Sequence, residues 1–335
     1  MAPLAGRRIA RLARTGSLPK VVRAVRREAW LRGERARLAR ALAGDEPLVV
    51  GPFVGEVGFE LLYWRPFVRR LLRDHRVDPA RVTVVSRGGA GLWYRDVAGD
   101  TRDVLDVVAP DELRVGVEER AARIGQRKQV DVDAFDRELL DRLGLADRAL
   151  LHPLHVYWSF RFVWEGLEPP AAALHRGDYD ALERDPSLLD GLELPERFVA
   201  VKAYANDCLP ATGENRKAVR ELVARLAADR PVVALDTGLA LDDHAELDAG
   251  AGDVVSVAGR LDARRNLAQQ SEIVARADAL VATYGGFSYL GPYHGVPTVA
   301  VASAPEWNPA HEAVLRAVFP DARYVRAEPE EASIP

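Results

Sequence analysis

The stretch VATYGGFSYLGPYHGVPTVAV, from Val281 to Val301, places four glycines and two prolines between two runs of small and β-branched apolar residues. This pattern predicts a buried strand, a tight turn at Gly285 and Gly286, a short helix that begins near Phe287, and a second strand after Pro297. A strand, a helix and a strand in this order are typical of a parallel α/β sheet.

The start of that short helix is the first candidate binding site. Its first N–H groups have no partner within the helix, and they lie at the positive end of the helix dipole. Such a helix start suits a phosphate group. An ordinary tight connection between two strands has the same composition, however, so this stretch alone does not distinguish structure from binding.

The composition is that of a globular protein with more than one domain. The chain has 335 residues, of which 48% are hydrophobic and 29% are charged, and this length predicts two domains of about 150 residues. Cys208 is the only cysteine, which excludes an intramolecular disulfide framework and a multi-cysteine zinc site. With no signal-peptide pattern and no run of about 20 apolar residues, we expect a cytoplasmic protein whose membrane contact, if any, is peripheral.

Residues 1–45 are predicted to form a basic helical arm. Its first 43 residues hold twelve arginines and lysines but only two acids, Glu28 and Glu34. Such a segment suits an anionic membrane surface or an acidic partner. A solvated basic helix that packs against the body of the protein is the alternative. Because Trp30 is the only aromatic residue in this segment, we do not expect nucleic acid as a partner.

The rest of the chain alternates between strand and helix patterns. We expect an N-terminal Rossmann-like domain at 46–170, a linker at 171–195, and a C-terminal Rossmann-like domain at 196–335 that ends in a helix. Pro66 is expected to bend or restart the helix that follows the first strand. The predicted fold class is therefore α/β, with two Rossmann-like domains that face each other across a cleft.

The longer stretch NLAQQSEIVARADALVATYGGFSYLGPYHGVPTVAV, 266–301, resembles the C-terminal domain of GT-B glycosyltransferases, in particular the heptosyltransferase and fucosyltransferase-like families. In those families a glycine turn receives the diphosphate of a nucleotide sugar. The resemblance implies that Gly285, Gly286, Phe287 and Ser288 hold the donor diphosphate. The chain departs from the heptosyltransferase pattern at Tyr289, where that family usually has a histidine. Sugar-nucleotide epimerases share the fold.

The same resemblance implies further donor contacts at the ends of strands. Cations after the first strand of the second half would neutralise the leaving diphosphate, and polar residues after the next strands would contact the base or ribose. A helix-start surface arginine and a strand-edge lysine are the structural alternatives for the two cations. The candidates are Lys202, Arg216, Asp236, Thr237, Gly259 and Arg260.

In the first half, the stretch GPFVGEVGFELLYW, 51–64, resembles the first strand, loop and helix of the GT-B fold, whose loop faces the acceptor and often carries the catalytic carboxylate. Glu56 and Glu60 are the candidates, since a buried carboxylate can take a proton from an acceptor hydroxyl. A role limited to the helix dipole or a cap is the alternative for either one. His155 is a weaker candidate.

Acceptor contacts are expected from two further segments. In SRGGAGLWYRD, 86–96, a loop after the second strand offers Arg87 and Trp93, and an aromatic run, 155–164, offers Trp158. Packing between domains is the alternative for that run. The glycine spacing in the loop also resembles a dinucleotide fingerprint, but it follows the second strand of its unit and lacks the third glycine.

We expect no metal ion and no other cofactor, because the D-x-D sequence at Asp131 to Asp133 precedes a helix and does not follow a strand. The predicted function is therefore a metal-independent glycosyltransferase. It would use a nucleotide-sugar donor and a glycan or small-molecule acceptor. An epimerase or a polysaccharide pyruvyl transferase on the same fold, or a noncatalytic protein that binds sugar nucleotides or glycans, are the alternatives.

Overall fold

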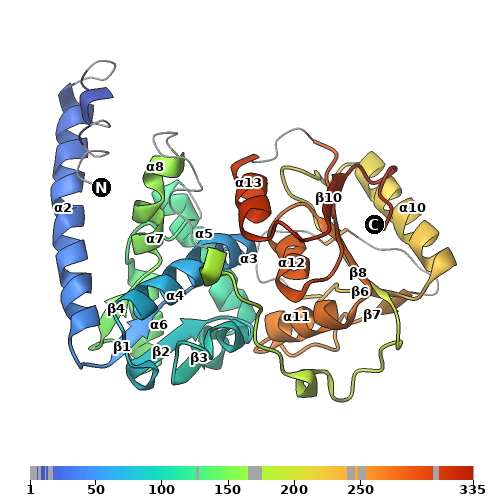
Figure 1. Cartoon of the computed structure of the whole chain (residues 1–335), viewed down its shortest axis with the longest axis horizontal. Coiled ribbons are helices and arrows are strands. Elements are labelled where there is room, and N and C mark those ends of the chain that lie inside the picture. The colour runs from blue at the N-terminus through green and yellow to red at the C-terminus, as the bar shows by residue number, and fades with distance from the viewer. Residues whose placement is uncertain are drawn as a thin grey trace.

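The first half of the chain forms a four-stranded parallel sheet (Figure 1). The computed structural model describes residues 18–125, 128–164, 176–239, 246–247, 254–304 and 309–334, together with Gly6, residues 9–11 and Ala13. In the sheet order β3-β2-β1-β4, the strands are β1 (Leu48–Val50), β2 (Val82–Ser86), β3 (Asp100–Asp103) and β4 (Ala149–Leu151). All residues of β1 and β2 are buried, as expected for apolar runs in a parallel sheet that is covered on both faces.

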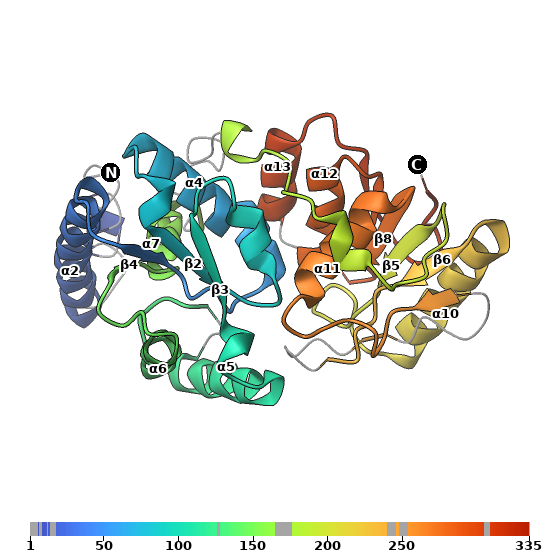
Figure 2. The same ribbon diagram turned by 90° about the horizontal axis from the view of Figure 1, so that it is seen from below.

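Helices cover the two faces of this sheet, and one long helix lies beyond its end (Figures 1 and 2). The long helix, α2, occupies the side of the first half that faces away from the second half. The helical segments are α2 (Leu18–Ala43), α3 (Val57–Phe59), η1 (Glu60–Trp64), α4 (Arg65–Asp74), η2 (Pro79–Arg81), η3 (Ala90–Tyr94), η4 (Val104–Asp106), α5 (Pro110–Ile124), α6 (Ala134–Arg142), α7 (Leu154–Ser159) and α8 (Arg161–Trp164).

The second half forms a six-stranded parallel sheet with the order β10-β9-β8-β5-β6-β7. Its strands are β5 (Val199–Lys202), β6 (Val232–Ala234), β7 (Val254–Ser256), β8 (Ala279–Thr283), β9 (Thr298–Val301) and β10 (Tyr324–Ala327). The helices are α10 (Gly213–Asp229), α11 (Asn266–Arg276), η7 (Gly286–Tyr289), α12 (Leu290–His294) and α13 (Pro309–Val318), with η5 (Arg176–Asp178) and η6 (Pro186–Leu189) in the segment before β5.

These two parallel sheets with flanking helices confirm the predicted α/β fold class. The opening stretch adopts the predicted strand, glycine turn, short helix and strand, as β8, η7, α12 and β9. Gly295 ends α12 in the left-handed conformation, with a φ of 68°, which glycine adopts at little cost. The predicted boundaries at 170 and 195 stay predictions. Within the described part of the chain, no helix is long and apolar enough to cross a membrane.

The helix after β1 contains a π-helical turn, η1, just before Pro66. Proline has no N–H group, and its ring would clash with the carbonyl four residues earlier in a regular α-helix. Two tyrosines bind carbonyl groups of this turn: the Tyr179 hydroxyl donates to Leu62 O at 2.7 Å, and the Tyr293 hydroxyl donates to Leu61 O at 2.7 Å. Since Tyr293 belongs to α12, the irregular turn also joins the two halves.

Candidate functional site

A cavity of about 540 Å³ lies between the two halves at the carboxyl ends of their strands. Open α/β sheets bind their ligands at this edge. The first half contributes the segment Glu56–Phe59 after β1 and Arg87 after β2. The second half contributes Tyr204 after β5, Thr237 after β6 and the turn Gly285–Phe287 after β8. The cavity therefore brings together side chains that five different strands position.

The two glycine-containing loops touch each other at one wall of this cavity. A Cβ atom added to Gly286 would lie 2.5 Å from Gly58 N, and one added to Gly58 would lie 2.6 Å from Gly286 Cα. Real side chains do not approach a backbone this closely, so both positions require glycine for the observed contact. Gly285 has a φ of 143°, in the region that side chains disfavour. The turn is thus built for close approach of backbone.

Two helix starts converge at the same place. The helical run that begins with α3 at Val57 points its first turn at the cavity, and the run that begins with η7 at Gly286 does so from the other half. The first turns of both helical runs, with their positive dipole ends, therefore face one space. An anionic group such as a phosphate fits this arrangement.

Glu56 lies immediately before α3, with an extended backbone (φ −67°, ψ 136°). Its side chain is exposed, and it lines the cavity. Among the described residues it makes no capping hydrogen bond to the helix, so the simple cap proposed as its structural alternative is absent from this structure. Its carboxylate is accessible to a ligand in the cavity.

Arg87 is 5% exposed and forms part of the cavity wall. Its guanidinium donates to Gly55 O at 2.8 Å, which fixes the residue before Glu56. The Nε atom of Arg87 is buried and has no hydrogen-bond partner among the described residues. A buried donor without a partner costs free energy, and a ligand oxygen or a water molecule at this point would relieve that cost.

On the second half, Lys202 forms an ion pair with Glu246 at 2.8 Å and donates to Leu235 O at 2.8 Å. Glu246 also accepts from the N–H groups of Thr237 and Gly238. Burial opposes ionisation of Glu246, but the charge of Lys202 and these hydrogen bonds outweigh it and lower its pKa. Lys202 therefore lines the cavity, where its charge is paired with that of Glu246.

Glu246 and His311 also line the cavity, and neither was predicted as a site residue. The Tyr63 hydroxyl lies 2.6 Å from His311 Nδ1, and this contact joins η1 of the first half to α13. Burial, followed by the charge of Lys128, lowers the pKa of His311 to about 4. The imidazole is thus neutral at pH 7 and is oriented by Tyr63.

Seven of the predicted residues line this cavity: Glu56, Arg87, Lys202, Thr237, Gly285, Gly286 and Phe287. Nine others do not line it: Glu60, Trp93, His155, Trp158, Arg216, Asp236, Gly259, Arg260 and Ser288. The Ser288 hydroxyl is completely buried, donates to Gly285 O and contacts the Tyr324 hydroxyl at 2.9 Å. The Ser288 side chain therefore stabilises the glycine turn and does not line the cavity.

The remaining residues outside the cavity have identifiable structural surroundings. His155 and Trp158 line a different cavity, under α2. Trp93 is completely buried, and its carbonyl accepts from Arg65. The Gly259 N–H donates to Thr237 O at 3.2 Å, and the neighbouring Arg260 is exposed. Arg216 lies in the first turn of α10, and Asp236 directly follows Leu235 after β6.

Glu60 is completely buried beneath the cavity wall, where the Tyr94 hydroxyl donates to its carboxyl group at 2.8 Å. Burial raises the pKa of Glu60 to about 7, although Tyr94 and the charge of Arg87 oppose the rise. Its position excludes direct contact with a ligand in the cavity. Glu60 lies in the helical run, as predicted, but the prediction left open whether its carboxylate faces the acceptor or points away from it.

The raised pKa of Glu60 makes stability depend on pH. Below pH 4.5 the carboxyl is protonated in both states, whereas between 4.5 and about 7 only the folded state keeps the proton. The free energy of unfolding therefore falls as pH rises through this window. We expect the wild type to lose about 2 to 3 kcal/mol relative to Glu60→Gln between pH 5 and pH 8, as measured by urea unfolding.

The exposed Glu193 provides the matched control for this measurement. Glu193→Gln should follow the wild type at both pH values, because its carboxyl is solvated in both states. Parallel pH profiles for the wild type and Glu60→Gln would contradict the assignment of a buried, protonated Glu60.

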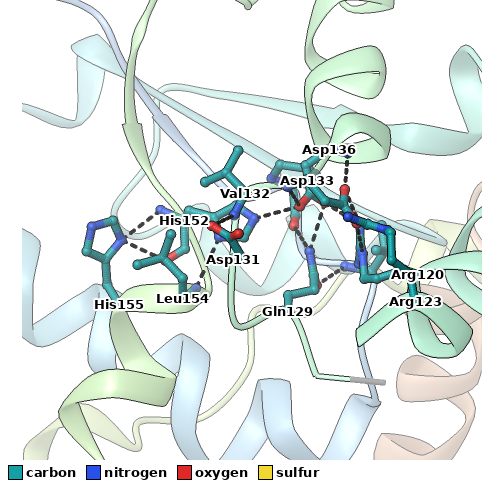
Figure 3. Close-up of polar contacts among 12 residues, drawn as sticks. Arg120, Arg123, Gln129, Asp131, Val132, Asp133, Asp136, His152, Leu154 and His155 are labelled. Atoms are coloured by element: carbon teal, nitrogen blue, oxygen red, sulfur yellow. Dashed lines mark hydrogen bonds and ion pairs between the residues drawn. The ribbon is translucent and has the colours of Figure 1, made fainter. Parts of the chain in front are cut away.

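A buried polar network supports the loop that carries Glu56 (Figure 3). Arg120 donates to both Asp133 and Asp136, at 2.7 and 2.5 Å. His152 contacts Asp136 at 3.0 Å. Gln129 donates to Asp136 and to Pro52 O, and its side-chain oxygen accepts from the Val54 N–H at 3.0 Å. The network therefore extends from α5 and α6 to the backbone just before Glu56.

Asp133, the last residue of the D-x-D sequence, has a structural role in this network. It caps α6 in a reciprocal capping box with Asp136. Burial opposes its ionisation, but hydrogen bonds from Arg120 and from the Asp136 N–H lower its pKa to about 2. Within the described residues, no group of three or more His, Cys, Asp or Glu side chains is placed to hold a metal ion.

Replacing Arg120 by Met is expected to lower the free energy of unfolding by about 3–5 kcal/mol, because two buried carboxylates lose their shared partner. Chemical unfolding at pH 7 measures this change. Arg123, on the same helix, contacts Asp133 at 2.7 Å but is 58% exposed, so Arg123→Met should cost less than about 1 kcal/mol. Equal losses in the two variants would show that the burial of Arg120 does not determine the loss in the free energy of unfolding.

Comparison with solved structures finds similar chains at low sequence identity. A glycosyl transferase family 9 protein from Veillonella parvula has a TM-score of 0.45 and 13% identity, covering 86% of this chain and 87% of its own. ADP-heptose LPS heptosyltransferase II from E. coli has a TM-score of 0.44 and 14% identity, covering 84% of this chain and 90% of its own. UDP-GlcNAc 2-epimerase from Methanocaldococcus jannaschii has a TM-score of 0.39 and 7% identity, covering 84% of this chain and 88% of its own. Similarity at this level says nothing about substrate or reaction.

Comparisons of the sequence alone give no match. No protein-family model matches the chain, and no curated protein sequence is significantly similar to it.

Proposed function

We propose that this protein is a metal-independent glycosyltransferase that moves a sugar from a nucleotide-sugar donor to an acceptor hydroxyl. The observation that carries the proposal is the meeting of two helix starts, one from each half, at the contact of Gly58 with Gly286. Donor N–H groups from both halves then face the same anion. The accessible carboxylate of Glu56 lies in the same wall.

In this proposal the donor diphosphate lies against the turn Gly285–Phe287 and the first turn of α3. The buried Arg87, with its Nε donor directed at no protein group among the described residues, adds positive charge on the same side of the cavity. These fixed dipoles and this charge stabilise the negative charge that develops on the leaving diphosphate. A metal ion is not needed for that task.

The chemical step is a substitution at the anomeric carbon of the donor sugar. Glu56 accepts the proton of the acceptor hydroxyl while the acceptor oxygen forms a bond to that carbon. The bond from the same carbon to the diphosphate oxygen breaks, and the nucleoside diphosphate leaves with the electron pair. The ion pair of Lys202 and Glu246, together with Thr237, provides hydrogen-bonding groups at the opposite wall for the nucleoside.

A thermal-shift screen of UDP-, GDP-, dTDP- and ADP-linked sugars tests the proposal. A ligand at 100 times its Kd stabilises the folded state by about 2.7 kcal/mol, a shift that is readily measured. The compound with the largest shift is then incubated with and without acceptors. Transfer to an acceptor supports the proposal, whereas isomerisation of the donor without acceptor would identify an epimerase. Binding without turnover would identify a noncatalytic protein, and no shift with any nucleotide would overturn the proposal.

A further inference from the structure

The loop after β1 extends beyond the end of β4, one of the two neighbours of that strand. β4 ends at Leu151, whose carbonyl accepts from the Gly51 N–H at 2.9 Å. On the other side, the Phe53 N–H donates to a carbonyl of β2 at 3.0 Å. The residues on each side of Phe53, Pro52 and Val54, are buried. Their backbone groups therefore need partners that β4 does not supply.

The side-chain amide of Gln129 provides these partners. Its Nε2 atom donates to Pro52 O at 2.8 Å, and its Oε1 atom accepts from the Val54 N–H at 3.0 Å. A residue of a parallel strand bonds its neighbour in the same way, through one N–H and one carbonyl group. The amide of Gln129 therefore takes the place of a neighbouring strand at this point of the loop.

Gln129 is itself fixed in position and orientation. It is 1% exposed, and its Nε2 atom also donates to Asp136 at 3.2 Å (Figure 3). Since Pro52 O and the Asp136 carboxylate can only accept, whereas the Val54 N–H can only donate, the amide fits in one orientation. Arg120 holds Asp136 from α5. The buried network thus determines where the Gln129 amide lies.

The residue directly before Glu56 connects this amide with the cavity. A Cβ atom added to Gly55 would lie 3.7 Å from Gln129 Oε1, which is an ordinary van der Waals distance. Arg87 donates to Gly55 O at 2.8 Å. The exposed side chain of Glu56 makes no capping hydrogen bond among the described residues. Its place in the cavity wall therefore depends on the backbone that Gln129 and Arg87 hold.

We propose that Gln129 is a positioning residue for Glu56. Gln129 does not line the cavity, and it acts through the backbone of Pro52 and Val54. The inference rests on the proposed function, in which Glu56 accepts the proton of the acceptor hydroxyl. A base must lie within hydrogen-bond distance of that proton, and a displacement of about 1 Å can lower the rate about 10²-fold. Loss of the Gln129 amide should therefore slow transfer much more than it weakens donor binding.

The variant Gln129→Met tests this proposal, because methionine has a similar length but no N–H group and only a weak acceptor. We expect turnover at saturating donor and acceptor to fall about tenfold or more, while the Kd of the donor changes less than about threefold. In a Glu56→Gln background the same change should lower turnover less than about twofold, because the carboxylate that it positions is already missing. Equal factors in the two backgrounds, or weaker donor binding with normal turnover, would overturn the proposal.

Gln269 offers a matched control in the second half. It is 5% exposed, its Nε2 atom donates to Leu188 O at 3.0 Å, and its Oε1 atom accepts from the Asp262 N–H at 3.1 Å. It does not line the cavity. Gln269→Met removes the same two kinds of hydrogen bond, so it should lower the melting temperature as Gln129→Met does but leave turnover unchanged. Equal losses of turnover in both variants would show that reduced stability is the cause and would contradict the positioning role.

Hydrogen exchange of the backbone amides tests the same role without sugar transfer. By mass spectrometry, Gln129→Met should exchange about tenfold faster than the wild type over residues 55–59, whereas Gln269→Met should not. If the wild type transfers no sugar, the proposed function fails, but faster exchange over this segment still supports Gln129 as the residue that holds Glu56 in place. Unchanged exchange over residues 55–59 would overturn the positioning role even in an active transferase.

Discussion

Replacing Glu56 by Gln is expected to reduce turnover at saturating donor and acceptor by about 10²-fold or more, while donor affinity stays unchanged. The amide keeps the size of the side chain but cannot accept the acceptor proton. Because Glu56 lies in the cavity wall and makes no capping hydrogen bond among the described residues, the change removes a reactive group and no visible structural contact. Turnover across pH and donor binding by calorimetry measure the two effects separately.

Two further variants show whether the loss is specific to Glu56. Glu60→Gln should retain most of the turnover, because Glu60 is completely buried and does not line the cavity. His311→Gln tests a second titratable group that lines the cavity and that Tyr63 orients. Normal turnover of Glu56→Gln together with a large loss in His311→Gln would transfer the role of base to His311. Equal losses in both would indicate damaged positioning of the substrate.

Local sequence patterns were sufficient to predict the fold class. The strands β1, β2, β5 and β8 are short runs of apolar, largely β-branched residues that are buried on both faces, and such runs specify parallel strands with helices on each side. The turn at Gly285 and Gly286 was also visible, because two adjacent glycines after a buried strand indicate a special backbone conformation. These features depend on neighbours in the sequence.

Features that depend on distant contacts could not be predicted. The π-helical turn before Pro66 is accommodated by Tyr179 and Tyr293, which lie more than 100 residues away in the sequence. Glu246 lies in an acidic stretch that shows no strand or helix pattern. Only the folded structure reveals its ion pair with Lys202.

The candidate site shows the same division between local and distant information. Residues directly after strands, such as Glu56, Arg87 and Thr237, line the cavity, because the carboxyl ends of parallel strands share one edge. Side chains inside helices, such as those of His155 and Ser288, do not, because their direction depends on packing that the sequence does not reveal.

The contact between the two glycine loops leads to the second large effect. Replacing Gly286 by Val is expected to weaken donor binding by at least 100-fold. The new Cβ would lie 2.5 Å from Gly58 N and 3.2 Å from Gly58 Cα, so the two loops must move apart. Each half should still fold, because the interior of neither sheet is altered. Calorimetric titration with the donor, together with a circular dichroism spectrum like that of the wild type, measures these two expectations.

Gly213→Val is the matched control, since a Cβ atom there meets nothing within 4 Å. It should bind the donor as the wild type does. Gly58→Ala and Gly286→Ala add atoms to the same contact from opposite sides, so their effects on binding should not add in the double variant. Once one substitution has separated the loops, the second has little left to disrupt. Strict additivity, or normal affinity in Gly286→Val, would show that donor binding does not require the two helix starts to meet.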